Sequence, residues 1–274
     1  MNTTDNADRP LDWMMRSPVK GLVALVAGGG SGIGEAAART FAANDGLVAI
    51  ADVRKEMADR VVATIVAAGG KAIAVAMDVA KQSDIDAALK TVLAQFGKLD
   101  VLINTAGVIK PAPLETTPLE DWRFSFAINV EGALMLARSC LPHLRKGRAP
   151  AIVNCSSLSG GRAYPMGGPY GPTKAALISL SRQMAIEWAE FGVRVNCVNP
   201  GIVDTPLVRA NVSPEMIKLR EERIPLHRMG TPAELADLIV FLASPAASFI
   251  TGQDINCDGG MSQALMVQKF KPAS

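Results

Sequence analysis

Short apolar runs alternate along the chain with amphipathic stretches of helical length. Runs of strand length lie at 22–27, 48–52, 72–77, 101–104, 151–155, 193–198 and, more weakly, 249–257. They are apolar almost throughout, which is typical of strands buried on both faces of a parallel sheet. Helical segments separate them, for example at 32–44 and 55–68. The pattern predicts an α/β fold, a doubly wound Rossmann sheet of about seven parallel strands with helices on both faces.

One domain accounts for most of the chain. No low-complexity linker or internal repeat interrupts the pattern, so we expect residues 19–261 to form a single unit. Residues 1–18 are predicted to be a flexible arm, and residues 262–274 a C-terminal tail. The segment 202–230 mixes apolar residues with a charged run at 218–223. It is predicted to be a helical flap over a site, with a solvated surface helix as the alternative.

Composition narrows the classes of function. The net charge is +2, from 28 basic and 26 acidic residues, so neither nucleic acid nor a membrane is an expected partner. The apolar runs are far shorter than the roughly 20 residues that span a bilayer. No signal peptide is expected at the N-terminus. The cysteines and histidines lack metal-ligand and CxxC spacing, which favours a cytoplasmic protein with buried thiols and no metal.

A glycine-rich sequence, GGGSGIG at 28–34, follows the first predicted strand and opens a helix. Its glycines fit a tight turn, a close approach to a pyrophosphate and close helix–strand packing. The helix N-terminus then offers free N–H groups and a positive dipole end to phosphates. This context predicts a dinucleotide site. The expected contacts in the turn are Gly28, Ser31, Gly32, Ile33 and Gly34.

Asp52 ends the second predicted strand, where a carboxylate accepts hydrogen bonds from both ribose hydroxyls and repels a 2′-phosphate. Ser31 and Val53 occupy the two positions where a cation for that phosphate would be expected, and neither is basic. Arg54 is the one nearby basic residue that could bind this phosphate and favour NADP instead. The sequence predicts NAD rather than NADP as the cofactor.

Other strand ends carry candidate ligands. Asp78 and Val79 follow the third strand, where the carboxylate would meet the adenine or cap the strand end. The next three strands end in NTAG (104–107), NCSS (154–157) and NPG (199–201). Parallel sheets bind ligands at the carboxyl ends of their strands, so these residues are expected to share one site.

Tyr170 and Lys174 are spaced i, i+4 in a predicted helix at 170–191, so their side chains share a face. The ammonium favours the phenolate, and such a phenol can exchange a proton with an alcohol or carbonyl near neutral pH. The YxxxK motif alone is common by chance. Here Ser157, at the end of the fifth strand, and Asn129, in the helix after the fourth, accompany it.

Together these motifs resemble the short-chain dehydrogenase/reductase family, in its NAD-preferring branch. The resemblance runs from about residue 20 to residue 260 and includes the glycine turn, 104–107, Asn129, Ser157, 170–174, Pro200, Gly201, Thr205 and 258–260. Two positions depart from the family pattern. Ala27 stands where a threonine is usual and Thr105 where a second asparagine is usual, which puts the stability of these loops in doubt rather than the chemistry.

The resemblance implies a role for each residue of the tetrad. Tyr170 would be the general acid/base, and Lys174 would favour its ionised form and bind the nicotinamide ribose. Ser157 would orient the substrate oxygen, and Asn129 would hold a water that links Lys174 to solvent. The further cofactor contacts implied are Asn104, Ala106, Gly107, Pro200, Gly201, the backbone of Val203 and the hydroxyl of Thr205, and the hydride would pass from the B face.

The function implied is NAD-dependent interconversion of a small secondary alcohol and a ketone. One alternative is a 3-oxoacyl-thioester reductase, although these usually prefer NADPH and carry a basic residue near the glycine turn. Another is a non-catalytic NAD-binding sensor, although these usually lose the tyrosine or lysine. An enoyl-thioester reductase spaces its tyrosine and lysine further apart.

Residues 158–168 and 202–225 are expected to line the substrate pocket. The apolar or aromatic side chains that they offer are Leu158, Tyr164, Met166, Leu207 and Val208. Arg162 would bind a substrate carboxylate or lie on the surface, and the surface is favoured.

Two helical segments, 130–144 and 169–191, carry more apolar residues than a helix needs on the one face that packs against a sheet. Relatives pair these helices across a two-fold axis, so we expect a homotetramer or homodimer. The alternative is that Met184 and Trp188 face the sheet, with a polar outer face through Ser181, Arg182 and Glu187.

Overall fold

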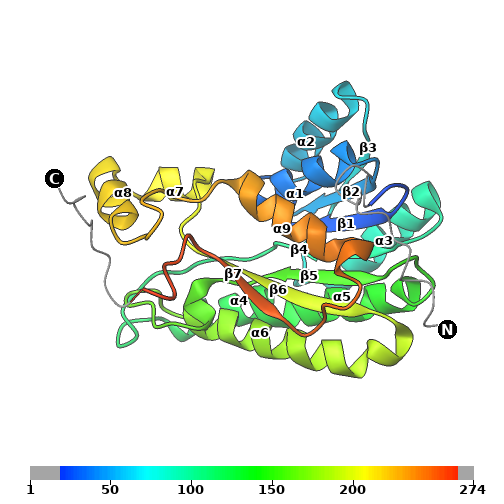
Figure 1. Ribbon diagram of the computed structural model, residues 1–274. Helices are drawn as coiled ribbons and strands as arrows, with labels where there is room; N and C mark the ends of the chain where they lie inside the picture. The colour runs from blue at the N-terminus through cyan, green and yellow to red at the C-terminus, as the bar shows by residue number, and fades with distance from the viewer. Residues whose placement is uncertain (1–18, 265–274) are drawn as a thin grey trace.

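The computed structural model describes residues 19–264, except the side chains of Leu207, Ala210 and Asn211. The predicted arm (1–18) and most of the predicted tail (265–274) lie outside this range. The described residues form one parallel sheet in the order β3-β2-β1-β4-β5-β6-β7 (Figure 1). Its strands are β1 (Val23–Ala27), β2 (Leu47–Asp52), β3 (Lys71–Ala76), β4 (Val101–Asn104), β5 (Ala151–Cys155), β6 (Arg194–Pro200) and β7 (Asp254–Cys257). The predicted doubly wound Rossmann sheet is confirmed.

Helices cover both faces of the sheet, as Figure 1 shows for α9 on one side and α6 on the other. One face packs on α1 (Gly32–Ala43), α2 (Lys55–Ala67) and α9 (Pro232–Ala243). The other packs on α3 (Gln82–Phe96), α5 (Gly132–Leu144) and α6 (Tyr170–Glu187). Alternate residues of each strand enter the two cores, so every position of β1 is apolar and buried.

The weakest predicted strand, 249–257, is shorter than expected. Only Asp254–Cys257 forms β7. Gly252 has a φ of +72°, which interrupts the extended backbone just before the strand. Phe249 lies fully exposed outside it. The edge strand therefore begins only where it pairs with β6.

A continuous helical run from Leu119 to Leu144 follows β4. It consists of α4 (Leu119–Phe126), a π-helical turn (Ala127–Glu131) and α5. Among the described residues this run alone has the length, 26 residues, and the hydropathy that also fit a membrane span. Its apolar side chains have another explanation, because Leu136, Cys140 and Leu144 are buried in the core beneath the sheet.

Most of the apolar side chains that the sequence assigned to α6 for subunit contact are not on its surface. Leu177, Ile178, Met184 and Trp188 are all buried within the subunit. Ser181, expected on the polar outer face in the alternative, is buried as well. These side chains are therefore not available for a subunit contact, whereas Leu180 is only partly buried and Ile186, on the same helix, is 76% exposed. The oligomer itself stays a prediction. The short helix η3 (Ala189–Phe191) completes the segment.

Candidate active site

The carboxyl ends of six strands open into one cavity of about 1070 Å³. Loops after β1 to β6, the start of α6 and the flap form its walls. The flap contains α7 (Pro206–Asn211) and α8 (Pro214–Glu221), and residues of both helices line the cavity. Every predicted site residue lines the cavity except Asn104 and Asn129.

The glycine turn is shaped for a phosphate. Gly28 has a φ of +73°, and a Cβ there would lie 2.8 Å from the backbone nitrogen of Ala106. A Cβ on Gly34 would lie 2.3 Å from the carbonyl oxygen of Gly28. Gly32 differs, because a Cβ there would meet only Thr205, at 3.5 Å. Ser31, the N-cap of α1, makes no side-chain capping bond. The helix N-terminus therefore faces the cavity with space above it, which fits a dinucleotide pyrophosphate.

Asp52 is tied to this turn. It is 7% exposed, and its two carboxylate oxygens accept hydrogen bonds from the N–H groups of Gly30 and Arg54, both at 3.0 Å. A Cβ on Gly30 would lie 2.6 Å from the carboxylate, so glycine is required there. Val53 is 69% exposed beside it. Arg54 also lines the cavity. The one basic residue that could favour NADP therefore lies within reach of a bound cofactor.

Asp78 makes the capping contact that was weighed for it, and its contact with the adenine stays a prediction. Its carboxylate accepts a hydrogen bond from the N–H of Ala80 at 3.0 Å and pairs with Lys81 at 3.4 Å. It caps the turn after β3, and it also lines the cavity with Val79.

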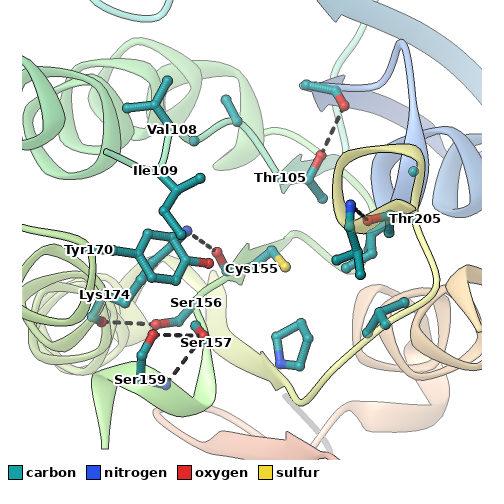
Figure 2. Close-up of a pocket in the computed structure, with 18 of the residues that line it drawn as sticks. Thr105, Val108, Ile109, Cys155, Ser156, Ser157, Ser159, Tyr170, Lys174 and Thr205 are labelled. Carbon is teal, nitrogen blue, oxygen red and sulfur yellow. Dashed lines mark hydrogen bonds between the residues drawn. The ribbon is translucent and has the colours of Figure 1, made fainter. Parts of the chain in front are cut away.

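Tyr170 and Lys174 stand one turn apart at the start of α6, as the i, i+4 spacing requires. The ammonium nitrogen of Lys174 lies 5.7 Å from the centre of the Tyr170 ring. Lys174 is 4% exposed, and its Nζ donates a hydrogen bond to the carbonyl oxygen of Cys155 at 2.8 Å. Figure 2 shows the pair on one side of the cavity and Thr205 on the other. Lys174 thus places a buried positive charge beside the Tyr170 ring.

Ser157 is held in position to donate. Its hydroxyl oxygen accepts hydrogen bonds from the hydroxyl of Ser159 at 2.8 Å and from its N–H at 3.2 Å (Figure 2). The hydroxyl proton of Ser157 is therefore left for a substrate oxygen in the cavity. Ser156 donates to the carbonyl oxygen of Lys174 at 2.8 Å, which ties the end of β5 to α6.

Asn129 acts on the site from outside the cavity. Its Oδ1 accepts from the N–H of Val108 at 2.8 Å, and its Nδ2 donates to the Val108 carbonyl and to the Thr173 hydroxyl. Thr173 in turn donates to the carbonyl of Tyr170. The point where a Gly107 Cβ would stand lies 3.2 Å from Asn129 Oδ1 and 3.3 Å from Lys174 Nζ. Asn129 thus fixes the start of α6, and Gly107 leaves room beside Lys174.

The side chain of Asn104 is bonded to a neighbouring strand, and its contact with the cofactor stays a prediction. Its Nδ2 donates to Asn154 Oδ1 at 3.1 Å, and Asn154 donates to Ser181 at 2.9 Å. The side chain is buried between β4 and β5 and does not line the cavity. The Cys197 thiol donates to Ser181 at the end of this network, and burial raises the pKa of that thiol to about 12. Asn104 therefore joins neighbouring strands.

Thr105, one of the two departures from the family pattern, secures the loop. Its hydroxyl donates to the Ala27 carbonyl at 2.8 Å and also lies 3.2 Å from the Gly28 carbonyl. The end of β4 is thereby bonded to the start of the glycine turn. Thr105 therefore supplies a bond between the two loops although it departs from the family pattern.

The substrate end of the cavity differs in part from expectation. Leu158, Tyr164 and Val208 line it as predicted, whereas Met166 does not and is 63% exposed. The side chain of Leu207 lies outside the described residues. Arg162 is a surface residue whose guanidinium donates to the carbonyls of Gly161 and Ser262. Within the expected range 202–225, further flap residues that line the wall are Met216, Leu219, Arg220 and Arg223.

Comparisons with known proteins agree with this architecture. The family model described as enoyl-(acyl carrier protein) reductase matches residues 27–262. A 2,5-dichloro-2,5-cyclohexadiene-1,4-diol dehydrogenase of Sphingobium indicum is 39% identical over 250 residues, which cover 90% of this chain and 99% of the relative. Meso-2,3-butanediol dehydrogenase of Serratia marcescens is 38% identical over 244 residues, covering 87% and 93%.

One solved structure also resembles this chain over most of its length. It is a 3-ketoacyl-(acyl-carrier-protein) reductase from Brucella melitensis complexed with NADH, with a TM-score of 0.83 and 38% identity, and it covers 89% of this chain and 99% of that chain. The chain therefore belongs to the short-chain dehydrogenase/reductase family. It is an oxidoreductase acting on CH–OH groups.

Proposed function

We propose that the protein is an NAD-dependent oxidoreductase that interconverts a secondary alcohol and a ketone. The observation that carries the proposal is that Tyr170, Lys174 and Ser157 line the same cavity as the glycine turn and Asp52. A bound nicotinamide would supply the hydride acceptor in oxidation and the donor in reduction. The residues that would hold the cofactor are the glycine turn, Asp52, Lys174 and Thr205.

The protein residues handle the proton and the substrate oxygen. In oxidation, the carbinol O–H bond breaks and its proton passes to the phenolate oxygen of Tyr170. A bound nicotinamide would accept the hydride from the carbinol C–H bond. Ser157 donates a hydrogen bond to the same substrate oxygen and orients it. Lys174 stabilises the phenolate by its charge. The contacts of Asn129 with Thr173 and Val108 keep the start of α6 in place.

A second candidate is reduction of a 3-oxoacyl thioester, favoured by the likeness to the Brucella melitensis reductase. The diol dehydrogenases among the relatives favour a small alcohol instead. Steady-state assays with NAD and a panel of secondary alcohols and diols, and with NADH or NADPH and acetoacetyl thioesters, would separate the two. A protein that binds NADH but turns over no substrate in either panel would be a sensor.

Cofactor choice is expected to depend on Asp52. NAD should be preferred to NADP by at least about 1.4–3 kcal/mol, roughly 10- to 150-fold in kcat/KM. Asp52→Ala should remove much of this preference, because the carboxylate no longer repels a 2′-phosphate. Asp59→Ala is the matched control, since Asp59 pairs with Lys55 on the surface of α2. Equal kcat/KM with both cofactors in the unmodified protein would show that Arg54 outweighs Asp52.

Assembly remains a proposal, as a homotetramer or homodimer. It rests on the family resemblance and on exposed apolar side chains, of which Phe249 is fully exposed and Ile186 is 76% exposed, rather than on the buried face of α6. Light scattering at micromolar concentration is expected to give a multiple of 28.8 kDa, and the monomer mass would contradict the proposal. A cytoplasmic location is likewise proposed. It is consistent with four free cysteines, three of them buried.

A further inference from the structure

One face of α8 is turned into the cavity. Met216, Leu219 and Arg220 are spaced i, i+3, i+4 on this helix, and all three line the cavity. Arg223, in the turn that follows, continues the same face and lines the cavity as well. Lys218 and Glu222 are not part of the wall. The face therefore combines two apolar side chains with two guanidinium groups.

These two arginines differ from their neighbours in the flap. Arg209 is paired with Asp204, and Arg228 with Glu234. Within the part of the chain that the structure describes, no hydrogen bond or ion pair engages the side chain of Arg220 or Arg223. Their hydrogen-bonding capacity is available to a molecule in the cavity.

Charge is distributed unevenly along the cavity wall. Its carboxylates lie at one side of the sheet, Asp52 at the end of β2, with Arg54 nearby, and Asp78 after β3. The flap follows β6, on the opposite side of β1 in the strand order. Figure 1 shows α8 beyond α7, at the outer end of the flap. The substrate end is therefore positive, without a carboxylate among the wall residues described there.

We propose that Arg220 and Arg223 bind an anionic group of the substrate, so that the physiological alcohol or ketone is an amphipathic acid. The apolar body would lie against Met216, Leu219 and Leu158, and a carboxylate would be held by the guanidinium groups at the mouth of the cavity. This inference rests on the proposed function and names the substrate class for the same site. A phosphate would satisfy the same chemistry.

The test compares acids with their neutral esters. The probes are 3-hydroxybutyrate, 4-hydroxycyclohexanecarboxylate and 4-(1-hydroxyethyl)benzoate, each with its methyl ester. The unmodified protein should favour at least one acid over its ester in kcat/KM. The double variant Arg220→Gln/Arg223→Gln should lower kcat/KM for that acid by about 10- to 100-fold and leave the ester nearly unchanged. Lys218→Gln removes one positive charge from the same helix outside the wall and should change neither.

Calorimetric titration of each acid and ester into the NADH-bound protein measures the same contrast without turnover. A protein that oxidises none of the alcohols would contradict the proposed function, while the binding contrast would still decide the anion site. Esters that bind as well as acids in every pair would overturn the inference. So would a loss of NADH affinity in the double variant, which would assign the arginines to the cofactor pyrophosphate. Acetoacetyl-coenzyme A is compared with its N-acetylcysteamine analogue, and a preference only for the former would assign them to a thioester phosphate rather than a carboxylate.

Discussion

Replacing Tyr170 with phenylalanine is expected to lower kcat by about 10²- to 10⁴-fold, because the variant has no group that exchanges the proton of the substrate oxygen. The ring itself remains. It meets Tyr164 edge-on, with centroids 6.4 Å apart and planes at 72°, and this contact needs no hydroxyl. The fold and the affinity for NADH should therefore be preserved. Steady-state kinetics and a fluorescence titration with NADH measure the two properties separately.

Tyr164→Phe is the matched control for this experiment. Tyr164 is the other tyrosine of the chain, and it also lines the cavity. Loss of its hydroxyl should leave the proton transfer intact. If Tyr170→Phe kept more than about a tenth of the activity, or if Tyr164→Phe lost as much, the assignment of Tyr170 as the acid/base would be wrong.

Replacing Lys174 with methionine is expected to affect both catalysis and cofactor binding. The buried ammonium stabilises the phenolate, so kcat should fall by about 10²- to 10³-fold. The proposed bond to the nicotinamide ribose involves a charged donor, so the Kd for NADH should rise by about 10- to 150-fold. Methionine retains most of the buried stem, which is 4% exposed in the native chain, so the cavity walls are expected to persist.

Two readouts separate the roles of Lys174. Thermal unfolding without cofactor reports whether the variant still folds, since the Cys155 carbonyl loses its partner. Lys55→Met, at a lysine paired on the surface of α2, controls for the loss of a positive charge. A fall in kcat with an unchanged Kd for NADH would show that Lys174 acts on Tyr170 alone. A rise in Kd with an unchanged kcat would assign it to the cofactor alone.

The central strands could be predicted because strands buried on both faces are apolar at nearly every position. β4 and β5 begin and end at the predicted residues. The length of the edge strand β7 was overestimated, because the apolar pattern is weaker where a strand is only partly buried. The start of α9 is marked by a local sequence signal that does not belong to the pattern of apolar runs. Thr231 and Glu234 form a capping box, with Pro232 in the first turn.

The candidate site could be predicted where a motif and a strand end coincide. The glycine turn, Asp52, Ser157 and the Tyr170–Lys174 pair all line one cavity, because parallel strands present their carboxyl ends at one edge. Asn104 could not be placed in this way. Its side chain is directed by Asn154, on a neighbouring strand, and sequence spacing contains no information about that contact.

The sequence by itself determined the alternation of strands and helices, the glycine turn and the i, i+4 pair, because each depends on residues close together in the chain. Tertiary structure alone decided which residues of α6 are buried, how Asn129 is bonded to Val108 and Thr173, and which face of α8 enters the cavity. In the sequence, the charged run at 218–223 favoured a flap but was also consistent with a solvated helix. The orientation of its arginines depends on packing between elements distant in sequence, and local periodicity does not specify how such elements are placed relative to one another.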